Sequence, residues 1–207
     1  MLRRRLIPLR SHVSGAFVDG PRSIETASVV HLEELGLASA ERVRYDPSGW
    51  RDLRRVLRPE EVGPDDVFID FGAGKGRVLL VAAGRYRFRR VIGVELAESL
   101  AAIARANVEA SRRRLRCPDV EVVTADIVDY EIPDDATVAY LYNPFRGAVF
   151  DALVAKLIAS VDRCPRRLRL IYRTPLEHDR LLATGRFRLE RTVGGGYGAL
   201  HRYVLES

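Results

Sequence analysis

A cluster of glycines between two acidic residues has the residue types and spacing of a ligand-binding site. Asp70 lies in the apolar run VFIDF (67–71), and Gly72, Gly74 and Gly76 follow it before a segment of helical period begins. Glycines let the backbone turn tightly and approach a ligand with no Cβ in the way. Glu95 closes the next apolar run, where a carboxylate can accept hydrogen bonds from both hydroxyls of a ribose. These residues predict a site for a ligand that contains a ribose.

The spacing of the glycines narrows the choice of ligand. The segment GAGKG has the form GxGxG, whereas the dinucleotide fingerprint GxGxxG needs a small residue where Arg77 stands. A phosphate-binding P-loop needs Ser or Thr after a Gly-Lys pair, and here Lys75 is followed by Gly76. The spacing therefore disfavours NAD, FAD and P-loop nucleotides. A glycine turn without a ligand remains the alternative for the loop, and capping of the following helix remains the alternative for Glu95.

A third acidic residue follows the same pattern. Asp126 closes the apolar run VEVVTAD (120–126), and Ile127 comes next. The carboxylate of Asp126 can accept a hydrogen bond from the amino group of an adenine, and Ile127 offers an apolar surface to its ring. Because aspartate also opens turns, a plain turn is the alternative.

The elements that must position these residues alternate between strands and helices from about residue 64. Apolar runs of strand length at 67–71, 90–96, 120–126, 137–142 and 168–173 alternate with segments of helical period. This alternation predicts a parallel sheet covered on both faces. Two more runs, 187–193 and 199–205, are joined by GGGYG and too few residues for a crossover helix, so they predict an antiparallel hairpin.

The expected fold class is α/β: a doubly wound, mostly parallel seven-stranded sheet with a C-terminal antiparallel hairpin and an N-terminal helical cap. A length of 207 residues fits a single domain. Residues 64–207 would form its core, and residues 1–63 a cap or lid segment. Segments 23–37 and 50–57 of the cap have helical character, with the turn-rich link YDPSGW (45–50) between them.

Together, the strand–DFGAGKG–helix segment, VIGVE, TAD and the tail hairpin resemble a class I (seven-strand) S-adenosylmethionine-dependent methyltransferase. The resemblance covers roughly residues 60–207. It implies S-adenosyl-L-methionine as cofactor and S-adenosyl-L-homocysteine as product. By this resemblance the methionine part would be held by Asp70, Gly72, Ala73, Gly74 and Gly76. Glu95 would bind the ribose, and Asp126 with Ile127 would bind the adenine.

The cap also bears on the cofactor. Tyr45 and Trp50 flank a turn that contains Pro47 and Gly49. In the superfamily that the chain resembles, such a segment often folds over the cofactor, which makes Tyr45 a candidate contact. Pro47 and Gly49 would form a turn in any case, so a purely structural turn is the alternative.

The segment YLYNPF (140–145) is the candidate acceptor site. It ends the fourth predicted strand, at the edge of the sheet where ligands of open α/β folds bind. It resembles the Asn/Asp-Pro-Pro-aromatic motif of amino- and amide-methylating enzymes. This resemblance implies that Asn143 orients the acceptor and also contacts the cofactor, and that Phe145 stacks on the substrate or the sulfonium. The chain has one proline where those enzymes have two, so nitrogen is only slightly favoured over oxygen. A plain Asn-Pro turn is the alternative.

An oxygen acceptor would normally need a general base. The four histidines are His12, His31, His178 and His201, and no His/Asp pair with the spacing of a catalytic base emerges. Methyl transfer to nitrogen relies mainly on the alignment of nucleophile and methyl group.

The charge of the chain leaves nucleic acid as a second class of partner. The net charge is +6 and the basic residues are almost all arginine. The runs at 87–90, 112–116 and 166–169 precede predicted strands, where cations cap helix ends on the edge opposite the cofactor. We therefore expect a small-molecule or peptide/protein acceptor more than a nucleic acid. Arg51, Arg54, Arg55 and Arg58 are the exception, because they lie in the cap and could face an acidic substrate. A non-catalytic nucleotide-binding regulatory module is the remaining alternative.

Composition limits the cellular setting. No window reaches the ~20 apolar residues of a membrane helix, and the N-terminus lacks an apolar signal region. Cys117 and Cys164 lie far apart, without metal-ligand spacing. The expectation is a cytoplasmic protein with no membrane partner and no metal.

Overall fold

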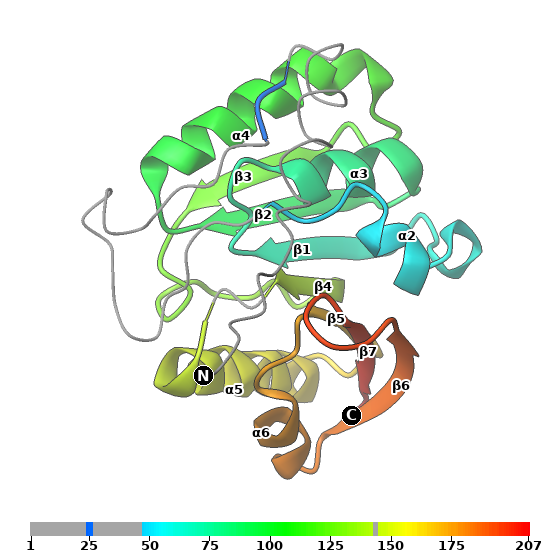
Figure 1. Ribbon diagram of the computed structural model, residues 1–207, viewed down its shortest axis with the longest axis vertical. Helices are drawn as coiled ribbons and strands as arrows, with labels where there is room; N and C mark the ends of the chain where they lie inside the picture. The colour runs from blue at the N-terminus through cyan, green and yellow to red at the C-terminus, as the bar shows by residue number, and fades with distance from the viewer. Residues whose placement is uncertain (1–23, 27–46, 143–144) are drawn as a thin grey trace, which may run out of the picture.

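One sheet of seven strands organises the molecule, which a computed structural model describes over residues 24–26, 47–142 and 145–207. The strand order is β3-β2-β1-β4-β5-β7-β6 (Figure 1). The helices are α2 (Asp52–Val56), α3 (Arg77–Arg85), α4 (Glu98–Ser111), α5 (Gly147–Arg163) and α6 (His178–Ala183), with short 3-10 turns at Pro59–Glu61 and Arg112–Arg114. The strands are β1 (Val67–Phe71), β2 (Arg90–Glu95), β3 (Val120–Thr124), β4 (Ala136–Tyr142), β5 (Leu168–Arg173), β6 (Phe187–Val193) and β7 (Leu200–Leu205).

The helices cover both faces of the sheet, and this explains the composition of the strands. Figure 1 shows α3 and α4 on one side of the sheet and α5 and α6 on the other. All five residues of β1 are buried, as expected for a central parallel strand packed on both faces. Phe68 packs with the helices α2 and α3, whereas Ile69 and Phe71 pack with α5. Two apolar layers, one on each face, therefore hold β1 in place.

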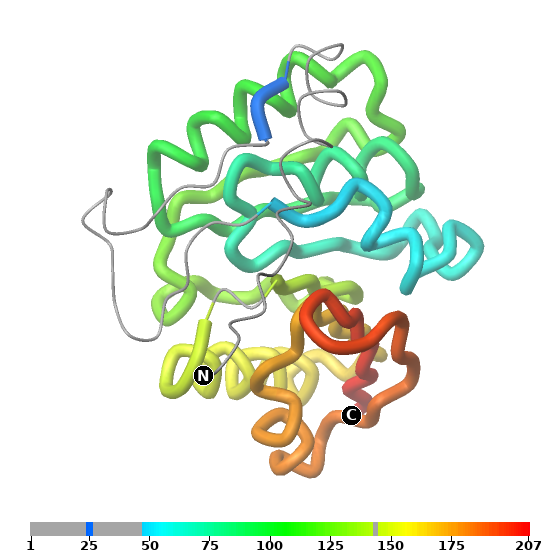
Figure 2. The backbone as a smooth tube through the Cα atoms, in the orientation of Figure 1, coloured from blue at the N-terminus to red at the C-terminus, as the bar shows by residue number. Residues whose placement is uncertain are grey.

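The C-terminal hairpin closes one edge of the sheet. Strands β1, β2, β3, β4 and β5 pair in parallel, whereas β7 pairs antiparallel with β5 and with β6. The tube in Figure 2 shows the hairpin at the end of the sheet far from α4. The structure thus confirms the predicted fold class, including the mostly parallel seven-stranded sheet and the antiparallel hairpin.

Some predicted boundaries were wrong by one or two residues. The third strand ends at Thr124 and not at Asp126, because the amides of Asp129 and Tyr130 bond to the Asp126 carbonyl and start a turn. The second strand ends at Glu95, and the last strand begins at Leu200. In the cap, the helix predicted at 50–57 spans Asp52–Val56. Most of the helix predicted at 23–37 lies outside the described residues.

Arginine caps a helix end at the edge where the sequence predicts it. The guanidinium of Arg166 donates to the carbonyl oxygens of Ser160 (2.8 Å) and Cys164 (2.9 Å) at the end of α5. The Ser160 carbonyl also accepts from Cys164 N at 3.0 Å, and the Cys164 carbonyl lies just beyond the last residue of α5. A cation that bonds to carbonyls at this end of the helix stabilises it. Among the described helices, none is long and apolar enough to cross a membrane.

Candidate functional site

The glycine loop between β1 and α3 bends sharply at the carboxyl edge of the sheet. Gly72, Gly74 and Gly76 all have positive φ angles of 78°, 54° and 80°, a region that favours glycine. The amides of Gly72 and Ala73 both donate to the Val94 carbonyl, at 2.8 and 3.1 Å, and tie the loop to β2. The loop therefore exposes backbone, rather than side chains, beside the end of β2.

A fourth glycine, which the sequence analysis did not single out, allows this close packing. Gly93 of β2 lies beside Asp70 in the sheet. A Cβ atom added to Gly93 would stand 2.6 Å from Leu79 Cδ1 and 2.9 Å from Ala73 Cβ. Only a residue without a side chain lets the loop and α3 approach β2 this closely.

Glu95 is held at the mouth of the loop by two backbone amides. Its Oε2 atom accepts from Gly74 N at 2.8 Å, and its Oε1 atom accepts from Ala97 N, at the start of α4, at 2.9 Å. Burial raises the pKa of Glu95, and these amide bonds partly offset the effect. Glu95 therefore does cap the start of α4, which was the structural alternative to a ribose-binding role. Each oxygen still has a second lone pair, so the carboxylate can also accept from two hydroxyls.

Asp70 is a buried carboxyl group aimed at the same region. It is 3% exposed and has no hydrogen-bond or ion-pair partner among the described residues. Burial, and then the nearby carboxylate of Glu95, raise its pKa well above the ordinary range. A buried acid without a partner is costly, and a cationic ligand would remove that cost. The donor set therefore fits S-adenosylmethionine, which carries an ammonium and a sulfonium.

Residues 24–26 lie over the loop and fix its position. Lys75 is buried and forms an ion pair with Glu25. The side chain of Asn107 on α4 donates to the backbone carbonyls of Glu25 (2.9 Å) and Lys75 (3.0 Å). Arg77 Nε donates to Thr26 Oγ1 at 2.8 Å. The loop is thus held from the side of α4 by a segment that is far from it in sequence.

A second part of the cap, residues 47–50, packs beside α3. Arg77 donates to the Ser48 carbonyl at 3.0 Å, and its guanidinium lies 5.1 Å from the centre of the Trp50 ring. Ser48 Oγ and Tyr140 Oη are 3.1 Å apart, which joins this segment to β4. Residues 47–50 therefore contact α3 and β4, two elements against which the loop strand β1 packs. Tyr45 lies outside the described residues, and its predicted contact with the cofactor stays a prediction.

The carboxyl ends of β4 and β5 carry a charged cluster that sequence reasoning missed. The guanidinium of Arg173 lies 4.2 Å from the centre of the Tyr142 ring, its neighbour across the strands, and forms an ion pair with Asp52. Asp52 also accepts from Gly49 N at 2.7 Å. Tyr142 of this cluster belongs to the predicted acceptor segment and directly precedes Asn143. No local motif joins these positions, so only the sheet register could have revealed the contact.

The structure describes only some of the predicted acceptor and adenine residues. Asn143 and Pro144 lie outside the described residues, so the orienting role of Asn143 stays a prediction. Phe145 is 8% exposed and Ile127 is 3% exposed, and both belong to the apolar layer under α5. Most of the surface of the Phe145 ring and of the Ile127 side chain therefore faces the core. Asp126 is half-buried and accepts from Val128 N at 3.2 Å, as a turn-opening aspartate does.

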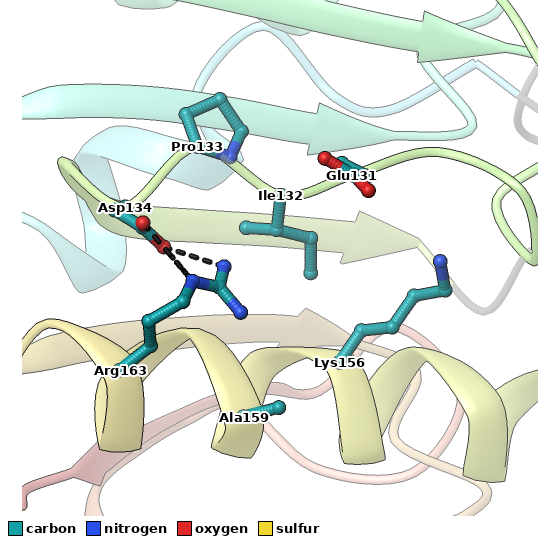
Figure 3. A pocket seen from close by; sticks show the side chains of 7 residues that line it. All are labelled: Glu131, Ile132, Pro133, Asp134, Lys156, Ala159 and Arg163. Carbon is teal, nitrogen blue, oxygen red and sulfur yellow. Dashed lines mark hydrogen bonds and ion pairs between the residues drawn. The ribbon is translucent and has the colours of Figure 1, made fainter.

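A groove of about 580 Å³ lies at the other edge of the sheet. Figure 3 shows it between α5 and the segment that precedes β4. The Asp134–Arg163 ion pair spans part of it, and Lys156 Nζ donates to the Tyr130 carbonyl at 3.0 Å. Since Asp134 stands before the first residue of β4, the groove begins at the amino end of that strand, whereas the glycine loop follows the carboxyl end of β1. Three of its charged residues, Asp134, Arg163 and Lys156, already have partners.

Comparisons with known proteins agree with this geometry. A family model described as "Histone methylation protein DOT1" matches residues 48–144, which include the glycine loop, Glu95 and Asn143. A "Protein-lysine N-methyltransferase" from Saccharolobus islandicus (strain REY15A) is 34% identical over 67 residues, which are 32% of this chain and 42% of that protein. A "Ribosomal RNA small subunit methyltransferase A" from Thermobifida fusca (strain YX) is 34% identical over 101 residues, which are 47% of this chain and 33% of that protein. The chain thus spans less than half the length of either relative.

Solved structures show the same fold. The mitomycin 7-O-methyltransferase MmcR superposes with a TM-score of 0.57 at 16% identity, over 76% of this chain and 53% of that one. The sheet order, the GxGxG loop with its two buried acids, and the matched relatives all point to one superfamily. Together these findings support a class I S-adenosylmethionine-dependent methyltransferase.

Proposed function

We propose that this protein transfers a methyl group from S-adenosylmethionine to a nitrogen of a protein, with the amine of a lysine side chain as the acceptor. The observation that carries the proposal is the pair of buried carboxylates, Asp70 and Glu95, at the glycine loop. The matching family model and the relative from Saccharolobus islandicus support a protein nitrogen as the acceptor.

The residues of the loop divide the work of holding the cofactor. The backbone at Gly72–Gly76 lies against the ligand, and Glu95 accepts hydrogen bonds from the ribose hydroxyls. Asp70 places a negative charge below the loop, which favours a cationic ligand over a neutral one. When bound, the cofactor supplies a methyl group that its sulfonium has already activated. The protein therefore contributes mainly alignment, charge and exclusion of water.

The acceptor would enter over the carboxyl ends of β4 and β5. Asn143 follows β4 and is proposed to accept a hydrogen bond from the acceptor nitrogen, which aims its lone pair at the methyl group. Two apolar side chains are exposed on loops of this edge, Leu176 after β5 (55%) and Tyr197 in the β6–β7 loop (74%). Exposed apolar groups around a site are typical of surfaces that bind other proteins.

A methyl-transfer assay tests this function. The protein is incubated with deuterium-labelled S-adenosylmethionine and a lysine-containing peptide, or a peptide with arginine in place of lysine. Mass spectrometry should show label on the lysine peptide alone. Asn143→Ala should lower kcat by about 100-fold, or about 2.7 kcal/mol, and leave cofactor affinity unchanged, since orientation acts on the transition state. Normal turnover by Asn143→Ala would remove the main support for a nitrogen acceptor.

An RNA acceptor is the second candidate, and one observation favours it. Four arginines of the α2 region are exposed and have no ion-pair partner among the described residues: Arg51, Arg54, Arg55 and Arg58. A row of unpaired guanidinium groups is suited to phosphate backbones. The ribosomal RNA relative from Thermobifida fusca supports this reading. Label transferred to RNA and not to peptides would select it.

A further inference from the structure

Two histidines share the hydroxyl of one tyrosine on the α5–α6 face of the sheet. The Nδ1 atom of His178, the first residue of α6, is 2.6 Å from Tyr203 Oη. The Nδ1 atom of His201 on β7 is 2.9 Å from the same oxygen. The two imidazole rings are 5.1 Å apart between their centres, in an edge-to-face arrangement. The roles proposed for the glycine loop and for the acceptor motif do not involve this cluster.

The number of protons in the cluster determines which group donates each hydrogen bond. A tyrosine hydroxyl has one proton, so it can donate to one Nδ1 atom, and the other imidazole must donate its own Nδ1–H to the tyrosine oxygen. O–H donors make shorter bonds than N–H donors. The 2.6 Å contact therefore fits Tyr203 donating to His178, and the 2.9 Å contact fits His201 donating to Tyr203. In this arrangement the Nε2 atom of His201 carries a free lone pair and that of His178 carries a proton.

Burial favours the uncharged forms of His201 and Tyr203. Burial and the neighbouring His178 lower the pKa of His201, so its imidazole is uncharged at neutral pH. Burial raises the pKa of Tyr203, so the hydroxyl keeps its proton. The other titratable or charged groups around the cluster come from β5, α6 and the segments before α5 and α6: Tyr172, Glu177, Asp179 and Arg146. Glu177 N bonds to Tyr172 Oη at 3.4 Å.

The cluster lies at the edge of the sheet where the acceptor would enter. His201 stands directly opposite Tyr172, the second-last residue of β5. The cluster therefore lies near the carboxyl end of that strand, on the face opposite the Arg173–Tyr142 contact. Both imidazoles are only partly buried. Within the described part of the chain, neither Nε2 atom has a hydrogen-bond partner. The Nε2 atom of His201 is therefore free to accept a proton, and the Nε2 atom of His178 is free to release one to solvent.

We propose that His201, Tyr203 and His178 form a proton-transfer chain that takes up the proton released by the acceptor nitrogen. The inference rests on the proposed function, because a lysine ammonium must lose a proton before its nitrogen can attack a methyl group. His201 Nε2 takes that proton, directly or through water, and His201 Nδ1 passes its own proton to Tyr203. The Tyr203 proton moves to His178 Nδ1, and His178 Nε2 releases one proton to solvent. The acceptor becomes a neutral amine, no net charge stays on the chain, and exchange with solvent at both Nε2 atoms resets it.

Nuclear magnetic resonance of 15N-labelled histidine tests the chain without any methyl acceptor. His178→Gln and His201→Gln assign the signals of the two rings. At neutral pH, one ring should be in the Nδ1–H form and the other in the Nε2–H form. In Tyr203→Phe the His201 ring should change toward the Nε2–H form and the His178 ring should keep it, whereas Tyr86→Phe, which removes the buried hydroxyl bonded to the Leu57 carbonyl, should leave both rings unchanged. Two Nε2–H rings in the unmodified protein would overturn the proposal.

The pH dependence of methyl transfer tests the role of the chain, with the lysine peptide as the probe. Tyr203→Phe should lower kcat by about tenfold to 100-fold at neutral pH. This is less than the roughly 100-fold or greater loss expected when an acid–base group itself is removed, because His201 remains and only the transfer beyond it is interrupted. The deficit should shrink as pH rises to about 10, because roughly 30% of a lysine amine with a pKa of about 10.4 is then already deprotonated. An equal deficit at every pH would show a structural role and contradict the chain. If the unmodified protein labels no peptide, the proposed function fails, and with it the role of the chain, whereas the resonance experiment still decides whether the chain exists.

Discussion

Glu95 is the side chain on which cofactor affinity should depend most directly. Its two oxygens are already oriented by the amides of Gly74 and Ala97, so they present fixed lone pairs to the ribose. Glu95→Ala should weaken binding of S-adenosylhomocysteine by about 1.5–3 kcal/mol, or roughly tenfold to 100-fold. Isothermal calorimetry measures this change. Glu109→Ala, at an exposed acid on α4 paired with Arg112, is the control, and equal affinities for both variants would refute the ribose role.

Asp70 should have opposite effects on stability and on binding. Its raised pKa means that the folded chain without cofactor holds this proton more tightly than the unfolded chain does. Stability therefore falls as pH rises from the ordinary Asp range through the raised pKa, and the carboxyl group destabilises the protein at neutral pH.

Asp70→Asn should raise Tm at neutral pH, by about 2–4 °C for each kcal/mol gained, and the gain should vanish below the ordinary Asp pKa. The same variant should bind S-adenosylmethionine more weakly. Scanning calorimetry across pH, together with a binding titration, checks both parts. A variant that is less stable and binds normally would show that Asp70 is a structural residue.

Local sequence patterns predicted the residues around the glycine loop, but not the charged cluster and the histidine cluster near the ends of β4 and β5. Asp70, the loop glycines and Glu95 could be predicted, because each stands at a strand end marked by an apolar run. The ion pair of Asp52 with Arg173 joins residues 121 positions apart, and the two histidines meet through Tyr203, which reads in the sequence as an ordinary strand residue. Such contacts depend on sheet register and helix placement, which a residue pattern does not give.

The contact between β2 and α3 can be tested with two glycines. At Gly93, a Cβ atom would meet both Leu79 and Ala73, so Gly93→Ala should destabilise the fold by about 1–3 kcal/mol and displace the loop. At Gly84, within α3, a Cβ atom would have no heavy atom within 4 Å, so Gly84→Ala should stabilise the protein by about 0.4–1 kcal/mol. Urea unfolding and cofactor titration of both variants check this contrast. Two variants of equal stability would contradict the described packing.

Strand bounds were predicted with unequal accuracy. The strands β1 and β5 and the edge strand β6 have the predicted bounds, the strands β2, β4 and β7 differ by one residue, and β3 ends two residues early. Strand β3 is an edge strand with partly exposed residues throughout, so its apolar pattern continues past its end into the turn at Asp126. The role of residues 1–63 as one cap over the core is our proposal, supported by the contacts of residues 24–26 and 47–50 with the loop and α3.

The net charge of +6 makes a prediction about the whole molecule. If the α2 arginines dock an RNA, the protein should bind single-stranded RNA with an affinity that falls steeply as salt rises. Changing Arg54, Arg55 and Arg58 together to glutamate should weaken RNA binding at least tenfold and leave cofactor affinity unchanged. Fluorescence anisotropy with a labelled RNA measures this. Matched changes at Arg112, Arg113 and Arg114, on the opposite edge of the sheet, are the control, and equal losses would point to unspecific charge attraction.

The central claim is that the glycine loop and its two acids bind S-adenosylmethionine. Calorimetric titration of the purified protein with S-adenosylmethionine, S-adenosylhomocysteine and NAD tests it most directly. We predict micromolar binding of both sulfur compounds at a single site and no binding of NAD. The dinucleotide fingerprint GxGxxG needs a small residue at its last position, and this chain has Arg77 there. Binding of NAD without binding of either sulfur compound would contradict the account.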